Sequence, residues 1–260
     1  MATMTRGQHD EAAQHLVAAR RAKRPGPRLP ESCRPADVDD GLEIQRRVQR
    51  LLGLETGGWK CSLPTVERPV ACAAIFAPTI LRESPCRVLT HGSILRIEPE
   101  IAFVLGRDLP PRAALYTEAE VRSAIAQTRL VLELLGSRYE EAALATFPEL
   151  LADQVSNQGL YVGPALRDAL FRPLEGFPIS IEGPTGTLHR GDGRHPDGHP
   201  LRPLVWLANF LASRASLGGL SAGQIVTTGS YAGALEVPVA SPLSVHFGDL
   251  GSLAVEFVAS

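Results

Sequence analysis

The sequence lacks the features that define several large classes of protein. No stretch of apolar residues approaches the roughly 20 that a helix needs to cross a bilayer, and no G-x-G-x-x-G follows a strand-like run, which argues against a dinucleotide-binding Rossmann domain. The four cysteines show no C-x-x-C spacing and so exclude the usual zinc-finger and thioredoxin-like patterns; they are Cys33, Cys61, Cys72 and Cys86. We expect them to be reduced thiols.

Strong charge of either sign is also missing. The 26 Lys and Arg residues nearly balance the 28 Asp and Glu residues, and the net charge of −2 gives no electrostatic case for binding nucleic acid or an anionic membrane surface. The one basic run, residues 18–28, is interpreted as a solvated helix end and linker. The N-terminal residues have no apolar core of the signal-peptide kind, so we expect a cytoplasmic protein.

The pattern of apolar residues changes near residue 57. Residues 1–56 predict an N-terminal helical segment, with a helix ending at Gly53, a favoured helix stop. Residues 57–260 predict a catalytic domain rich in strands, which we place at 92–106, 128–136, 159–163, 177–183, 224–230 and 252–260. Two helices are predicted among them, at 117–127 and from Pro203 to Gly218. Many strands with few helices favour an α+β fold with an antiparallel or mixed sheet.

Two glutamates stand on one face of the first of these strands. In RIEPEIAFVLG, Glu98 and Glu100 are two residues apart, so their side chains point the same way about 7 Å from each other. Two carboxylates that close repel unless water dilutes the charge or a cation joins them. One interpretation is a solvated edge strand, which Pro99 fits because proline belongs at sheet edges. The other is half of a metal site.

A third carboxylate lies inside an apolar run, LVLELLG. Burying an ionised Glu133 there costs several kcal/mol unless a partner compensates for it. An ion pair with Arg129 or Arg138 is one such compensation. Taken together, however, Glu98, Glu100 and Glu133 form an all-oxygen, negative set that suits a hard cation such as Mg²⁺ or Mn²⁺.

At these residues the chain resembles the fumarylacetoacetate hydrolase superfamily, and within it the 2-keto-4-pentenoate hydratase/4-oxalocrotonate decarboxylase group. The resemblance runs nearly end to end, from LEIQRRV at 42–48 to FGDLGSLAVEF at 247–257. Between them it is carried by GGWKCSLPT, RIEPEIAFVLGRDL, LVLELLGSRY, LADQVSNQGLYVG, VWLANFLA and LSAGQIVTTGS. It implies a mixed β-roll of the fumarylacetoacetate hydrolase type with an N-terminal helical segment, assembled as a homo-oligomer.

The resemblance also implies a set of site residues and a reaction. Glu98, Glu100 and Glu133 match the positions that bind Mg²⁺ or Mn²⁺. The remaining matches are two catalytic residues, Lys60 and Ser156, and two residues of a T-G-S loop near the substrate carboxylate, Thr228 and Ser230. The resemblance also implies that Lys60 binds the keto-acid end of the substrate. The implied activity is that of a metal-dependent lyase in aromatic-compound catabolism. Such an enzyme hydrates a 2-hydroxydienoic acid of the 2-keto-4-pentenoate type, and its metal stabilises an enolate.

The sequence departs from the family pattern in one place that bears on the reaction. Hydratases of the group carry an aspartate in a P-D-x-G-like turn downstream of the lysine, and here that region reads ACAAIFAPTI, without an acid. Three alternatives therefore stay open. They are a carbon–carbon hydrolase of an acylpyruvate (maleylpyruvate or fumarylpyruvate type), a 4-oxalocrotonate-type decarboxylase, and a non-catalytic metal-binding partner subunit.

Two further groups of residues resemble functional sites but have simpler interpretations. Superfamily hydrolases activate water with a His/Glu pair on an N-terminal segment, which His9 with Glu11, or Glu11 with His15, would imitate; a solvated helix start is the favoured interpretation. Residues 186–200 hold three histidines among glycines and prolines, and we interpret them as a flexible exposed loop rather than a zinc site.

Overall fold

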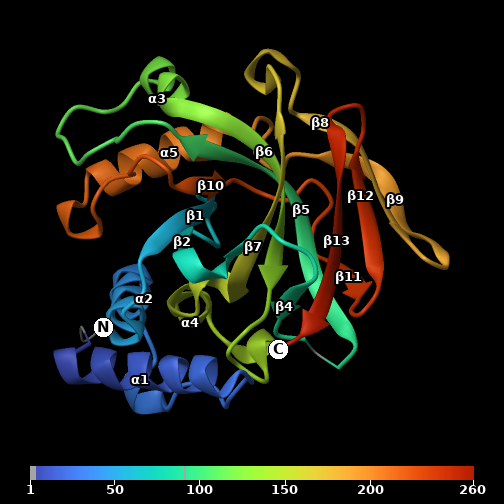
Figure 1. Cartoon of the computed structure of the whole chain (residues 1–260). Helices are drawn as coiled ribbons and strands as arrows, with labels where there is room; N and C mark the ends of the chain where they lie inside the picture. Colours follow the sequence, from blue (N-terminus) through green and yellow to red (C-terminus); the bar gives the residue numbers. More distant parts are fainter. Residues whose placement is uncertain (1–3, 91) are drawn as a thin grey trace.

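The computed structural model describes residues 4–90 and 92–260, and its first elements are helices. Helix α1 (Arg6–Ala22) starts at a capping box formed by Thr5 and Gln8. Helix α2 (Val38–Leu52) ends at Gly53, whose φ of 64° is the left-handed conformation that glycine adopts without strain. The two helices lie side by side at the bottom of Figure 1 and share an apolar core that includes Leu16, Ile44 and Val48.

The largest sheet has eight strands and is mixed. Its path runs β2-β1-β10-β5-β6-β7-β3, and β11 pairs with β5 beside β10. The strands are β1 (Thr56–Ser62), β2 (Ala71–Phe76), β3 (Ile80–Leu81), β5 (Ile94–Leu105), β6 (Ile125–Leu135), β7 (Asn157–Leu166), β10 (Ile225–Thr227) and β11 (Leu235–Pro238). Only β1–β10 and β3–β7 are parallel pairs within it. The sheet curls until β2 lies against β7, which gives the roll seen in Figure 1.

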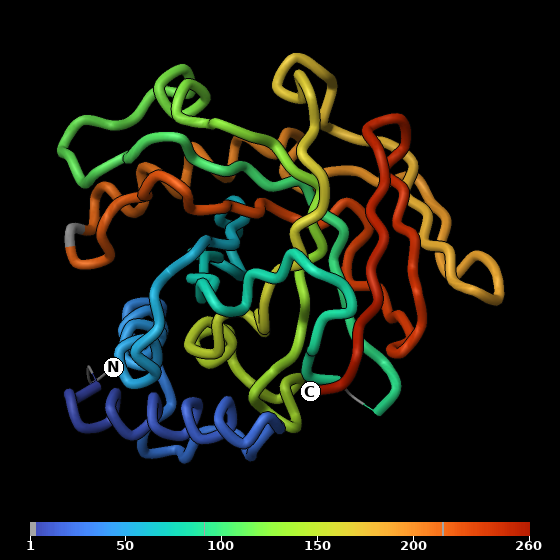
Figure 2. The backbone as a smooth tube through the Cα atoms, in the orientation of Figure 1, coloured from blue at the N-terminus to red at the C-terminus, as the bar shows by residue number. Residues whose placement is uncertain are grey.

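A second, antiparallel-rich sheet lies beside the roll. Its order is β4-β13-β12-β8-β9, and it occupies the right side of the tube view in Figure 2. Its strands are β4 (Cys86–Val88), β8 (Gly176–Gly183), β9 (Gly186–Arg194), β12 (Pro242–Phe247) and β13 (Gly251–Ala259). The remaining helices are α3 (Glu118–Ala124), α4 (Phe147–Ala152) and α5 (Leu201–Ala212). Within the described ranges no helix is both long and apolar enough to cross a membrane.

The inner face of the curled sheet is apolar at one end and acidic at the other. A buried cluster fills the apolar end and consists of Ile75, Ala102, Val131, Leu160, Val162 and Ile225. Because side chains alternate along a strand, Glu100 and Glu98 continue the face of β5 that carries Ala102, and Glu133 continues the face of β6 that carries Val131. The strands therefore place all three glutamates at one end of this small apolar core.

Pro99 lies in the middle of the sheet, so the interpretation of residues 96–105 as an edge strand is wrong. Strand β5 pairs with β6 on one side and with β10 and β11 on the other. Those two partners leave a gap beside Pro99, since β11 pairs with 94–97 and β10 with 102–104. The carbonyl of Pro99 points into this gap and accepts from Tyr231 N (3.0 Å). The nitrogen of Pro99, which carries no hydrogen, faces the same gap, so the proline costs the sheet no hydrogen bond between strands.

Two other sequence expectations are corrected by the structure. The helix predicted from Pro203 to Gly218 starts at Leu201 and ends at Ala212. Residues 186–194 form strand β9, paired with β8, instead of a flexible loop. His195, which follows directly, is buried (4% exposed) and meets the ring of Tyr231 edge-on. The fold uses this histidine as a packing residue, which its Gly- and Pro-rich surroundings do not reveal.

Candidate metal centre

Three carboxylates converge where β5 and β6 are paired. Glu98 is the register partner of Glu133, and Glu100 lies one step further along the same face of β5. Each of the three offers one oxygen, and these oxygens lie within 4.8 Å of one another. Glu100 and Glu133 are buried whereas Glu98 is half-buried, so the cluster opens to solvent on the Glu98 side.

Lys60 compensates for part of the negative charge of this cluster. It comes from β1, which the sheet order separates from β5 by β10 alone. Its Nζ lies 2.6 Å from Oε1 of Glu133 and donates to the carbonyl of Val155 (3.3 Å). The alternative partners of Glu133 are wrong, because Arg138 pairs with Asp153 and Arg129 bonds the carbonyl of Gly163.

Burial and mutual repulsion set the protonation of the site. Desolvation acts to lower the pKa of Lys60, but the nearby carboxylates of Glu133 and Glu98 outweigh it and leave the pKa raised. For Glu100, desolvation together with the charges of Glu133 and Glu98 raises the pKa to about 8. Desolvation and Glu133 raise the pKa of Glu98 in the same direction. The carboxyl groups of Glu98 and Glu100 therefore hold their protons more tightly than free carboxyl groups do, and a cation that binds here would displace those protons.

Several groups that orient the glutamates are not evident from the sequence. Thr227 Oγ1 and the backbone N–H of Gly229 (2.8 Å) both donate to Oε2 of Glu100. The amide of Asn157 donates to Oε1 of Glu133 (2.9 Å). The T-T-G-S loop contains Thr227, yet the resemblance pointed to its neighbour Thr228. Nothing in the sequence marks Asn157 as a site residue except its place directly after Ser156.

A strained turn brings a backbone carbonyl to Lys60. Gln154, Val155 and Ser156 all have left-handed φ angles, of 56°, 50° and 61°. Such conformations cost about 1–3 kcal/mol each outside glycine and persist only where the surroundings impose them. Here Nη2 of Arg20 on α1 donates to the side chain of Gln154, which also bonds the carbonyl of Ala74 (2.8 Å). The N-terminal helix thus helps to fix the turn beside Lys60.

The hydroxyl residues implied by the resemblance lie around the cluster without bonding it. Ser156 is half-buried and lines a cavity next to the site. Thr228 Oγ1 is buried and lies 3.5 Å from Nε2 of His195. Ser230 Oγ donates to the carbonyl of Gly233 (2.9 Å), a hydrogen bond within the loop that carries both residues. The substrate-directed roles of these three residues, and of Lys60, stay predictions.

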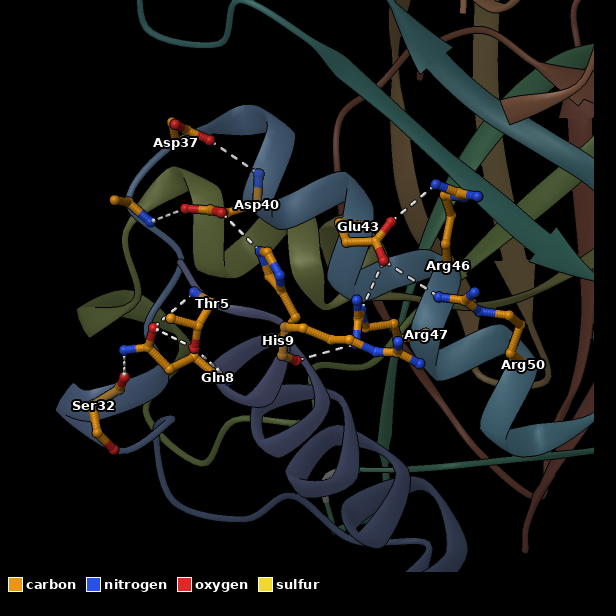
Figure 3. A network of polar contacts seen from close by, with 12 residues as sticks. Thr5, Gln8, His9, Ser32, Asp37, Asp40, Glu43, Arg46, Arg47 and Arg50 are labelled. Atoms are coloured by element: carbon orange, nitrogen blue, oxygen red, sulfur yellow. Dashed lines mark hydrogen bonds and ion pairs between the residues drawn. The ribbon is translucent and has the colours of Figure 1, made fainter. Parts of the chain in front are cut away.

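The N-terminal histidine and glutamate residues are placed on α1, against α2. Nε2 of His9 lies 2.8 Å from Oδ1 of Asp40, as Figure 3 shows, and His9 is buried, which corrects its interpretation as part of a solvated helix start. Glu11 and His15 are exposed. His9 therefore has a partner on α2 and a structural role in joining the two helices, whereas a water-activating His/Glu pair finds no support in these contacts.

The segment in place of the family's aspartate turn is a buried strand. Residues Ala71–Phe76 form β2, which pairs with β1 so that Ala73 lies opposite Lys60. Between Ala71 and Phe76 every side chain is apolar, and no acid from this strand faces the lysine.

The donor set fits a hard divalent cation. Three carboxylates that converge within a few ångströms, with two of them buried, suit Mg²⁺ or Mn²⁺, which prefer oxygen ligands. The half-exposed side at Glu98 leaves room for water or substrate oxygens. Among the described residues this is the one cluster of three or more acidic, histidine or cysteine side chains close enough to hold a metal.

Comparison with known proteins gives relatives along nearly the whole chain. The 2-keto-4-pentenoate hydratase of Paraburkholderia xenovorans is 30% identical, and the match covers 98% of this chain and 96% of that protein. A 4-oxalocrotonate decarboxylase of Pseudomonas putida is 27% identical over 83% of this chain and 82% of its own length. No family model matches the chain.

Solved structures show the same fold. The 4-oxalocrotonate decarboxylase of Pseudomonas putida, complexed with magnesium and adipate, has a TM-score of 0.79 at 20% identity and covers 99% of this chain and 100% of its own. Fumarylpyruvate hydrolase of Pseudomonas aeruginosa, with Mn²⁺ and pyruvate, has a TM-score of 0.53 at 13% identity, over 78% and 89%. The chain belongs to the 2-keto-4-pentenoate hydratase/4-oxalocrotonate decarboxylase group of the fumarylacetoacetate hydrolase superfamily.

Proposed function

We propose that the protein is a Mg²⁺- or Mn²⁺-dependent hydratase that converts a 2-hydroxydienoic acid of the 2-keto-4-pentenoate type into a 4-hydroxy-2-keto acid. The observation that carries the proposal is the three-glutamate cluster with Lys60 beside it, in a chain whose relatives at 30% identity are named as such hydratases. The overall change adds water: a hydroxyl goes to C4, hydrogen goes to C3 and C5, and the C2 enol becomes a ketone.

Glu98, Glu100 and Glu133 would hold the cation. When bound, it supplies Lewis-acid polarisation of the carboxylate and keto oxygens of the substrate. The hydrogen bonds from Thr227 and Gly229 to Glu100 keep that carboxylate aimed into the cluster. Asn157 does the same for Glu133.

Lys60 is proposed as the residue that meets the keto-acid end of the substrate. Its raised pKa keeps the ammonium protonated, so it can attract the substrate carboxylate and donate a proton. Ser156, Thr228 and Ser230 are proposed to contribute hydroxyl groups around the substrate. With β2 free of acids, the base that activates water does not come from that strand.

Product analysis with purified protein and Mg²⁺ tests the proposal. With 2-hydroxypenta-2,4-dienoate, a hydratase gives 4-hydroxy-2-oxopentanoate, seen by NMR as a new methyl doublet. Release of carbon dioxide from 4-oxalocrotonate without hydration would assign the protein to decarboxylation, and two acids from fumarylpyruvate would assign it to carbon–carbon hydrolysis. Turnover of none of them would favour a non-catalytic metal-binding partner subunit.

Three further features belong to the same proposal. Residues 1–56 act as a helical segment that braces the catalytic domain of residues 57–260, consistent with the contact of Arg20 on Gln154. The protein works as a homo-oligomer in the cytoplasm. Light scattering of the purified protein and fractionation of its host cells test these two statements.

A further inference from the structure

A cavity lies one strand step beyond the metal centre along β5 and β6. Glu98 pairs with Glu133, and the next residues on the same faces, Arg96 and Leu135, pair with each other. One such step along a strand spans roughly 7 Å. Both Arg96 and Leu135 line a cavity of about 540 Å³, which lies in the size range of pockets for small molecules.

The strained turn forms a wall common to the cavity and the metal centre. The carbonyl of Val155 accepts from Lys60, and the amide of Asn157 donates to Glu133. Ser156 stands between these two residues and lines the cavity. A molecule whose head is held at the glutamates can therefore extend past this turn.

The lining of the cavity is mixed: it has a large apolar part, and its positive and negative charges balance. Its apolar members include Pro25, Leu89, Ile94, Leu95, Leu135 and Ala142. Two cations, Lys23 and Arg96, are matched by two acids, Glu140 and Glu236, and Glu236 is the cross-strand partner of Arg96. A second carboxylate entering here would gain from the cations what it loses to the acids.

We propose that this cavity binds an apolar tail, so that the substrate is a 2-hydroxydienoic acid extended well beyond five carbons and ending in an apolar group. The inference rests on the proposed function, because that function places the keto-acid head at the glutamates. A five-carbon substrate leaves the cavity unfilled. Each further methylene group buried there tightens binding about fourfold.

Calorimetric titration of the Mg²⁺-loaded protein with unreactive 2-keto acids tests the inference without requiring turnover. The ligands are 2-oxopentanoate, 2-oxononanoate and the dicarboxylate 2-oxoheptanedioate. We expect 2-oxononanoate to bind at least tenfold more tightly than 2-oxopentanoate, and the dicarboxylate to bind no more tightly than 2-oxopentanoate. Equal affinities for the two monocarboxylates, or tightest binding of the dicarboxylate, would overturn the inference.

A pair of variants locates the effect in the cavity. Ala142 lines the cavity, so Ala142→Trp places a large ring there, whereas Ala143→Trp places the same ring on an exposed neighbour. We expect Ala142→Trp to abolish the chain-length preference while keeping the affinity for 2-oxopentanoate, and Ala143→Trp to retain both. An unchanged preference in Ala142→Trp would contradict the proposed binding place.

The two proposals fail in different ways. A protein that binds 2-oxononanoate tightly but hydrates no dienoate loses the proposed function and keeps the apolar-tail cavity. A protein that hydrates 2-hydroxypenta-2,4-dienoate but binds both monocarboxylates equally keeps the function and loses the cavity as a tail site.

Discussion

Nζ of Lys60 lies 2.6 Å from Oε1 of Glu133, and both side chains are largely shielded from water. The ammonium thus offsets part of the repulsion among three carboxylates whose oxygens lie within 4.8 Å of one another. A divalent cation would compete with the ammonium of Lys60 for the negative charge of the three carboxylates. Lys60 and the cation should therefore oppose each other in binding, although both serve the proposed reaction.

Replacing Lys60 tests this opposition. Lys60→Met leaves the buried glutamates unpaired, a loss of about 3 kcal/mol or more, which lowers the melting temperature of the metal-free protein by roughly 6 °C. Added Mg²⁺ should then raise the melting temperature more than it does in the wild type, because the competing charge is gone. We expect turnover to fall by about 100-fold or more, since a positioned proton donor is lost.

Lys60→Arg is the matched control for that experiment. It keeps the positive charge and should retain most of the metal-free stability, whereas turnover should still fall because the guanidinium does not give up its proton. A metal-free Lys60→Met protein as stable as the wild type would contradict the role of Lys60 as the compensating cation.

Thr227 is expected to support the metal site through Glu100. Thr227→Val removes the hydroxyl that donates to Oε2 of Glu100 while keeping the shape of the side chain. Loss of such a supporting bond lowers metal affinity by about 10- to 100-fold. Thr227→Ser restores the hydroxyl and should restore the affinity, measured by calorimetric titration with Mg²⁺. Equal affinities in the Val and Ser variants would show that this hydrogen bond does not aim Glu100.

Metal binding should depend on pH through Glu100. The pKa of Glu100 is about 8 in the folded protein. The metal-free folded protein therefore keeps a proton on Glu100 up to about that pH, whereas the unfolded chain, with an ordinary carboxyl pKa, releases it at lower pH. The metal-free protein therefore loses stability as pH rises from about 4.5 to about 8, and Mg²⁺ binding releases a proton in that range.

Titrations with Mg²⁺ in buffers of different ionisation enthalpy measure this release. We expect close to one proton per Mg²⁺ at pH 6.5, an apparent affinity that rises roughly tenfold per pH unit below pH 8, and a plateau above it. Affinity that is constant from pH 6 to pH 8 would show that Glu100 is already ionised in the metal-free protein.

The turn at residues 154–156 gives a prediction about strain. Val155 has a φ of 50°, which a β-branched residue rarely adopts, and asparagine tolerates this region better. Val155→Asn should therefore keep the melting temperature within a few degrees and preserve the carbonyl contact with Lys60. Val155→Pro is incompatible with a positive φ and should lower both stability and Mg²⁺ affinity. Similar melting curves for the two variants would mean that the turn is not required in this conformation.

The strands that carry the metal cluster could be predicted from the sequence because the patterns that mark them lie within a few neighbouring residues. Glu98 and Glu100 share a face by simple alternation, and Glu133 stands out as an acid in an apolar run. Their convergence was less accessible, because it depends on the register that sets Glu98 opposite Glu133. The resemblance to a known family supplied that long-range information.

The parts of the site that the sequence did not predict depend on tertiary context. Pro99 signals an edge strand, yet the sheet accepts it at a gap between two partners of β5. His195 lies among glycines and prolines that predict exposure, yet it packs edge-on against Tyr231. Asn157 donates to Glu133 from a position directly after three residues with left-handed φ angles. No periodic pattern in the sequence predicts any of these three features.

A thermal melt with EDTA and with increasing Mg²⁺ or Mn²⁺ tests the metal centre, with three proteins compared: the wild type, Glu133→Gln, and the exposed control Glu83→Gln. A cation that binds only the folded state raises the melting temperature further as its concentration grows. We predict this rise for the wild type and Glu83→Gln and its loss in Glu133→Gln. A wild type that melts at the same temperature in EDTA and in millimolar Mg²⁺ or Mn²⁺ would contradict the three-glutamate metal centre.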